Sequence, residues 1–112
     1  MIKKYTVKIT EQAQIQIGEI TQYIASELFS SAIALRLLAV FEKEIASLSY
    51  LPSRYAFIKE EPWHSEGVRK KVVKNFLVYF WIDERKQIIQ VIAVVYARRD
   101  QVKQLLKMFK HS

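Results

Sequence analysis

The sequence predicts an α+β fold, in which an N-terminal helical hairpin packs on a mostly antiparallel β-sheet and a short helix follows at the C-terminus. Two observations predict this fold. Apolar residues recur every three or four positions through residues 11–50, which is the period of amphipathic helices. Residues 67–97 are instead rich in β-branched and aromatic side chains, which favour strands. Helices followed by a run of strands are typical of a helical layer covering one face of a sheet.

The chain of 112 residues has the size of one domain, and we expect residues 1–112 to form a single unit. A hydrophobic content of 51% with two glycines and two prolines favours a folded chain over a disordered one. The chain has no cysteine, which excludes disulfides and fits a reducing cytoplasm. The N-terminus lacks the apolar run of a signal peptide, and the longest apolar runs are too short to span a membrane.

The first strand and helix are predicted from local patterns. Residues 5–9 alternate between apolar and polar, as in a half-buried strand. Thr10 is a suitable N-cap for a helix over residues 11–28, because its hydroxyl can accept a hydrogen bond from a first-turn amide. The apolar positions of that helix form one stripe: Ala13, Ile17, Ile20, Ile24 and Leu28.

A second helix is expected over residues 32–50, with Ser30 or Ser31 as its cap. Its apolar face is broad enough to contact both the first helix and a sheet. Pro52 ends it, because the residue before a proline avoids the helical region of φ/ψ space.

Three strands are expected after the weakly patterned residues 53–66, where residues 55–58 form an optional strand. The three strands cover residues 68–74, 76–82 and 88–97. The middle one is apolar on both faces, so we expect a central strand that is covered on both sides. Lys74 and Asn75 form the tight turn before it, with Asn75 tolerant of positive φ. A last short helix is expected to start near Asp100.

The whole chain has a net charge of +7, and its positive charge is concentrated in the second half. Residues 1–66 hold seven Lys or Arg against eight Asp or Glu, a balance of −1. Residues 67–112 hold eleven against three, a balance of +8. This asymmetry suggests a negatively charged partner such as nucleic acid, a ribosome or an acidic protein segment. A basic surface that serves only solubility is the alternative.

The candidate binding residues come from the two ends of the strand region, which an antiparallel meander brings near each other. Arg and Lys can neutralise phosphates, and an aromatic side chain can stack on a base. The candidates for target binding are Arg69, Lys70, Lys71, Lys74, Tyr96, Arg98 and Arg99. Structural roles are the alternative, since adjacent arginines often bind a carboxylate and Asp100 follows them.

Several kinds of site are absent from the sequence. The two histidines, His64 and His111, lack metal-ligand spacing, and no cysteine is present, so we expect no metal site and no cofactor. Gly18 and Gly67 stand alone, so they cannot form a phosphate-binding loop. No serine lies in a nucleophile-elbow pattern.

The sequence resembles the RelE/ParE superfamily of bacterial type II toxin–antitoxin toxins over nearly its full length. The most specific parts are residues 67–70 (GVRK), 75–80 (NFLVYF) and 95–100 (VYARRD). The N-terminal residues 5–13 and the turn at residues 52–54 also agree. The superfamily fold, a helical hairpin on an antiparallel sheet, is the one that periodicity predicts independently.

The resemblance implies a growth-arresting toxin that a cognate antitoxin neutralises, with operator DNA bound only indirectly, through the antitoxin. ParE-like members inhibit DNA gyrase, whereas RelE-like members cut mRNA on the ribosome without a metal. Ribonuclease members place an Arg early in the central strand, where this chain has Phe76 and Leu77, so the ParE branch is favoured. In the ribonuclease alternative, the active residues are Arg69, Lys71, Arg98 and His111. A non-toxic nucleic-acid- or protein-binding adaptor is the third hypothesis.

Overall fold

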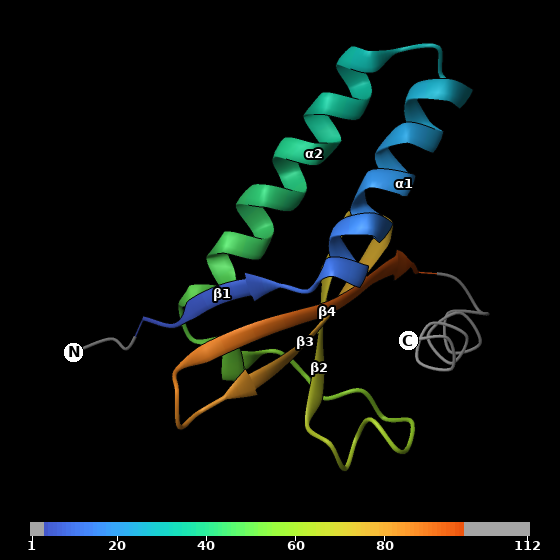
Figure 1. Cartoon of the computed structure of the whole chain (residues 1–112). Helices are drawn as coiled ribbons and strands as arrows, with labels where there is room; N and C mark the ends of the chain where they lie inside the picture. The colour runs from blue at the N-terminus through green and yellow to red at the C-terminus, as the bar shows by residue number, and fades with distance from the viewer. Residues whose placement is uncertain (1–3, 98–112) are drawn as a thin grey trace.

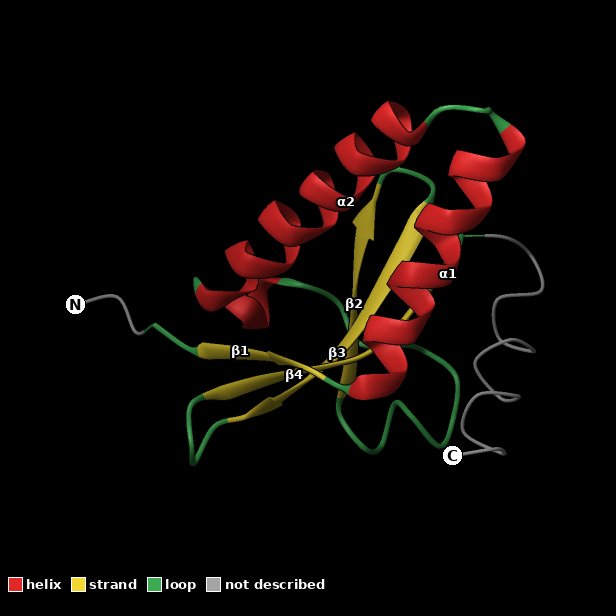
Figure 2. Ribbon diagram, turned by 45° about the horizontal axis from the view of Figure 1, so that its top comes forward, coloured by secondary structure: helices red, strands yellow, loops and turns green. Residues whose placement is uncertain are grey.

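The structure is a computed structural model that describes residues 4–97, so the expected last helix, Arg98, Arg99 and His111 lie outside the described residues. Two long helices lie side by side on one face of a four-stranded sheet (Figures 1 and 2). This arrangement confirms the predicted α+β class. In chain order, the elements are β1 (Thr6–Ile9), α1 (Glu11–Glu27), α2 (Ser31–Ala46), the 3-10 turns η1 (Ser47–Ser49) and η2 (Pro52–Arg54), β2 (Val68–Val73), β3 (Phe76–Asp83) and β4 (Ile88–Tyr96).

The sheet has the strand order β1-β4-β3-β2. β2, β3 and β4 form the predicted antiparallel meander, and β1 pairs parallel to β4. The parallel pair is possible because the chain between β1 and β4 is long and includes both helices, β2 and β3. In β4, Ile92 is an extra residue, because Tyr79 pairs with Ala93 while Phe80 pairs with Val91.

Both helices begin at the predicted caps. The Thr10 hydroxyl accepts a hydrogen bond from the Ala13 amide at 3.2 Å, and the Ser30 hydroxyl accepts one from the Ile33 amide at 3.2 Å. α2 ends at Ala46 rather than near residue 50, because the chain tightens into η1. Leu51 then takes a left-handed φ of 46° before Pro52, which turns the chain toward the sheet.

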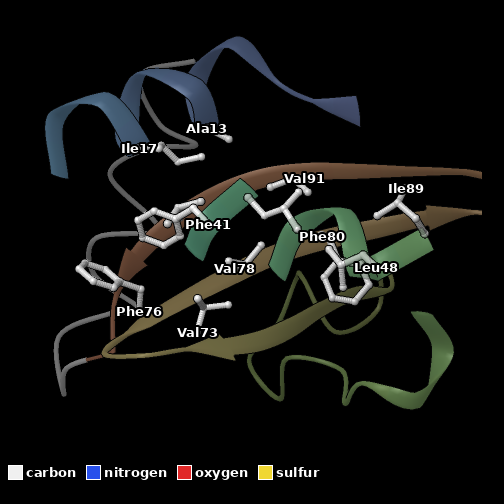
Figure 3. Packing of buried hydrophobic residues seen from close by; sticks show 12 residues of the cluster. Ala13, Ile17, Phe41, Leu48, Val73, Phe76, Val78, Phe80, Ile89 and Val91 are labelled. Carbon is white, nitrogen blue, oxygen red and sulfur yellow. The ribbon is translucent and has the colours of Figure 1, made fainter. Parts of the chain in front are cut away.

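The main core lies between the helices and the sheet (Figure 3). Ala13 and Ile17 of α1 and Phe41 of α2 meet Val78 and Phe80 of β3 there. The predicted stripe is thus confirmed at its N-terminal half, while Leu28 at its other end is 55% exposed.

A second, smaller core covers the opposite face of β3, as its two-sided apolar pattern predicts. Ile58 and Trp63, from the segment before β2, pack there with Leu77 and Tyr79 of β3. The optional strand is reduced to one bridge between Phe57 and Arg69, with flanking hydrogen bonds that include Ile58 N to Val68 O at 2.8 Å.

The turn between β2 and β3 differs from prediction in one respect. Lys74, with φ 56°, takes the left-handed conformation that we expected to suit Asn75. Val73 pairs with Phe76, so the turn has only two residues, and its first residue, Lys74, takes the positive φ.

Candidate functional site

The strand β2 sends its basic side chains to opposite faces of the sheet. Val68 belongs to the small core and Val73 to the main core, so alternation places Arg69 and Lys71 on the helical side. Lys70 therefore lies on the other side, together with Val72. Adjacent cations in the sequence thus do not form one surface patch.

Lys71 is occupied inside the fold. Its ammonium lies 2.8 Å from the Glu44 carboxylate and donates to the Ser47 hydroxyl at 2.6 Å and the Glu44 carbonyl at 3.0 Å. Only 7% of Lys71 is exposed. The hydrogen bond from Lys71, reinforced by its charge, lowers the pKa of the Glu44 carboxyl. These contacts join β2 to the C-terminal end of α2, so we assign Lys71 a structural role.

Arg69 is held in a cradle made by the segment before β2. Its Nη1 donates to the Ser53 carbonyl at 3.0 Å and to the Tyr55 carbonyl at 2.7 Å. Its guanidinium carbon lies 3.8 Å from the centre of the Phe57 ring. We call these groups, the two carbonyls and the Phe57 ring, the Arg69 cradle. Sequence patterns did not indicate the cradle, because its main ligands are backbone carbonyls.

The remaining cations of this region are more accessible. Lys70 is half-buried opposite Tyr79, and Lys74 is exposed in the β2–β3 turn. Between them, Val72 is 64% exposed, which leaves an open basic and apolar strip at the sheet edge. We call Lys70, Val72 and Lys74 the β2 strip.

Tyr96 ends β4 on the helical side, where its ring packs on Phe76 with centroids 4.6 Å apart. The Ala97 amide then donates to the Asn75 carbonyl at 2.9 Å. The chain that leads to Arg98 therefore starts beside Lys74. Arg69 lies five residues before Lys74, about 17 Å from it at strand spacing. The expectation that the meander brings the start of β2 near the end of β4 is therefore wrong, because these two ends pair with opposite ends of β3.

The aromatic residues of β3 serve packing more than stacking. Tyr79 is 2% exposed, and burial, with a smaller contribution from the Glu60 charge, raises the pKa of its phenol to about 12. Trp81 is 40% exposed, but its indole lies over Gly67, where an added Cβ would be 3.7 Å from the ring. Phe76 and Leu77, at the start of β3, are both buried.

Within residues 4–97, no group of three or more His, Cys, Asp or Glu side chains is placed to hold a metal ion. No helix in that part of the chain is long and apolar enough to cross a bilayer.

Comparison with known families decides the affiliation of the chain. The family described as "ParE toxin of type II toxin-antitoxin system, parDE" matches residues 7–101. The chain belongs to this ParE toxin family. It is therefore a toxin of a type II toxin–antitoxin system, and the resemblance seen in its motifs is confirmed.

Two solved structures have a fold similar to that of this ParE-family chain. A chain of the chromosomal ParDE system from P. aeruginosa is similar with a TM-score of 0.70 and 18% identity, over 85% of this chain and 98% of that one. A chain of the toxin–antitoxin complex RelBE2 from Mycobacterium tuberculosis is similar with a TM-score of 0.60 and 20% identity, over 83% and 98%. No curated protein sequence matches the chain.

Proposed function

We propose that this ParE-family toxin arrests growth by binding and inhibiting DNA gyrase, without catalysing a reaction itself, and that a cognate antitoxin neutralises it in the cytoplasm. The pairing with an antitoxin is supported by the titles of its structural neighbours, which describe toxin–antitoxin systems. Any contact with operator DNA then belongs to the antitoxin.

The observation that carries the choice of gyrase is the apolar start of β3. In the ribonuclease branch, the resemblance implies an arginine at this point. Here Phe76 is 3% exposed and Leu77 is 4% exposed, and both lie in core clusters. A cation introduced there would have to enter an apolar core at a cost of several kcal/mol, so the position does not suit phosphate chemistry.

We assign the target contacts to the β2 strip. Lys70 and Lys74 place two positive charges around the exposed Val72, and Lys74 lies at the end of the sheet from which the chain continues to Arg98 and Arg99. Charges of this kind steer a basic protein to an acidic or DNA-bound target.

Purified toxin tests the proposal directly. We expect it to inhibit gyrase supercoiling and to leave mRNA intact in toeprinting on translating ribosomes. Lys70→Gln with Lys74→Gln should weaken inhibition about tenfold, because two charged contacts are lost. Lys8→Gln with Lys86→Gln removes the same charge from exposed positions elsewhere and is the matched control. Ribosome-dependent mRNA cleavage with unaffected gyrase would replace the proposal with the ribonuclease alternative.

A further inference from the structure

The guanidinium of Arg69 is oriented by backbone carbonyls, and no carboxylate within residues 4–97 neutralises it. Both of its hydrogen bonds to the described residues use Nη1, which leaves the edge formed by Nε and Nη2 without a partner among those residues. Lys71–Glu44 is the one ion pair within residues 4–97, so no carboxylate there balances Arg69. A charged group that is held in one orientation with an open edge is typical of a binding residue. The fold already restricts the side chain, so binding loses little further conformational entropy.

The geometry of that open edge selects an anion that presents two oxygens side by side. Nε and Nη2 donate in parallel, and this spacing matches a bidentate carboxylate or phosphate. The Phe57 ring covers one face of the guanidinium at 3.8 Å and keeps the plane of the fork fixed.

The chain segment that forms the Arg69 cradle carries no acidic residue. Between Glu44 and Glu60 the sequence has no Asp or Glu, and it contributes Arg54 and Lys59 to this region. Leu51 is 55% exposed and Phe57 is 40% exposed on the same segment. An exposed aromatic ring beside arginine is typical of protein–protein interfaces, where aromatic residues and arginine are enriched.

The distribution of cations favours a protein carboxylate over nucleic acid here. A nucleic-acid site neutralises several phosphates along one face. In β2, Arg69 lies on the helical side, Lys70 lies on the opposite side, and Lys71 is buried against Glu44. Arg54 stacks on the Tyr55 ring beside the cradle, with its guanidinium carbon 4.9 Å from the ring centre. One oriented arginine with a second nearby, next to exposed apolar side chains, fits an acidic side chain within an apolar peptide.

We propose that the Arg69 cradle binds an aspartate or glutamate side chain from an acidic, apolar segment of the cognate antitoxin. This inference rests on the proposed pairing with an antitoxin, and it places that contact on a surface separate from the β2 strip.

The test uses the full toxin and its cognate antitoxin, with affinity measured by calorimetry. Arg69→Gln should weaken binding by about 10- to 100-fold, because the charged donor pair at the fork is lost. Arg69→Lys should lose affinity nearly as much, since it keeps the charge but not the fork. Arg36→Gln, on an exposed position of α2, removes the same charge and should change affinity less than about twofold.

A second measurement does not depend on the variants folding. In the wild-type protein, the NMR resonance of the Arg69 Nε–H group should shift, and its exchange with water should slow, when the antitoxin saturates the toxin. An unchanged resonance in the saturated complex overturns the proposal, as does unchanged affinity of folded Arg69→Gln. A shift caused by a short DNA duplex, with none caused by the antitoxin, also overturns it and assigns the Arg69 cradle to phosphate. Failure of gyrase inhibition leaves all these readouts unaffected, so the two proposals fail separately.

Discussion

Lys71 and Arg69 lie two residues apart on the same side of β2, yet their charges have different partners. Lys71 meets a carboxylate at 2.8 Å, whereas Arg69 meets only carbonyls and an aromatic ring. The difference arises from the elements packed above them, since Lys71 lies under the end of α2 and Arg69 lies under the segment that follows η2. Strand alternation explains why both lie on one face, but neither alternation nor residue type predicts which of them is neutralised.

The Lys71–Glu44 pair gives the stability of the protein a defined dependence on acid. Because Lys71 lowers the pKa of Glu44 in the folded state, the pair stabilises the fold above the ordinary carboxyl pKa of 4.5. That stabilisation is lost as the pH falls from there through the lower, folded-state pKa. The Glu44→Gln variant lacks the carboxyl and therefore this acid-dependent stabilisation. The difference in unfolding free energy between wild type and the variant should therefore shrink as the pH falls from about 6 to about 3.

Urea denaturation at a series of pH values measures this gap. Glu42→Gln, on an exposed position of α2, is the matched control and should follow the wild type throughout. A gap that stays constant over the acid range would show that Glu44 does not couple to Lys71 in solution.

At the scale of elements, the caps, the helical periods and the three-strand meander were all predictable, because each depends on residues close in sequence. Thr10 and Ser30 cap their helices through local hydrogen bonds. The end of α2 was misjudged, since its last turn tightens into η1 under contacts that include the distant Lys71. The parallel placement of β1 also depends on distant pairing with β4, and no local pattern encodes it.

In the β2–β3 turn, Lys74 has both a strained backbone conformation and a place in the proposed target contact. Lys74 holds φ at 56°, a left-handed conformation that is costly for any residue with a Cβ. Lys74→Gly should therefore raise the unfolding free energy by up to about 1 kcal/mol. It should weaken gyrase inhibition at the same time, because the charge of the β2 strip falls by one.

Gln87→Gly separates the two effects, since Gln87 has φ 55° in the β3–β4 turn and belongs to no proposed contact. It should give the same gain in urea unfolding with inhibition unchanged. If Lys74→Gly also leaves inhibition unchanged, Lys74 is a turn residue without a role in target binding.

For the whole molecule, the sheet separates two layers of different character. The helices provide a broad cover on one face, while the other face depends on the irregular segment that holds Ile58 and Trp63 (Figure 2). The two-sided apolar pattern of β3 predicted that a second cover exists. It did not identify the cover, because residues 53–66 have no periodicity and cover the sheet through two isolated buried side chains, Ile58 and Trp63.

Trp63 is the larger of the two side chains by which this segment covers the sheet. It is 3% exposed and packs in the small core with Ile58, Leu77 and Tyr79. Trp63→Ala should lower the unfolding free energy by about 3–5 kcal/mol, since a large buried side chain is lost and leaves a cavity. Phe29→Asn is the contrasting control: Phe29 is 96% exposed at φ 49°, and asparagine tolerates that conformation, so the change should stay within about 0.5 kcal/mol.

Because the segment that Trp63 anchors also carries the carbonyls and ring of the Arg69 cradle, Trp63→Ala should reduce antitoxin affinity even where the protein remains folded. Calorimetry below the unfolding temperature checks this coupling, and a folded Trp63→Ala toxin that binds the antitoxin with full affinity would contradict it.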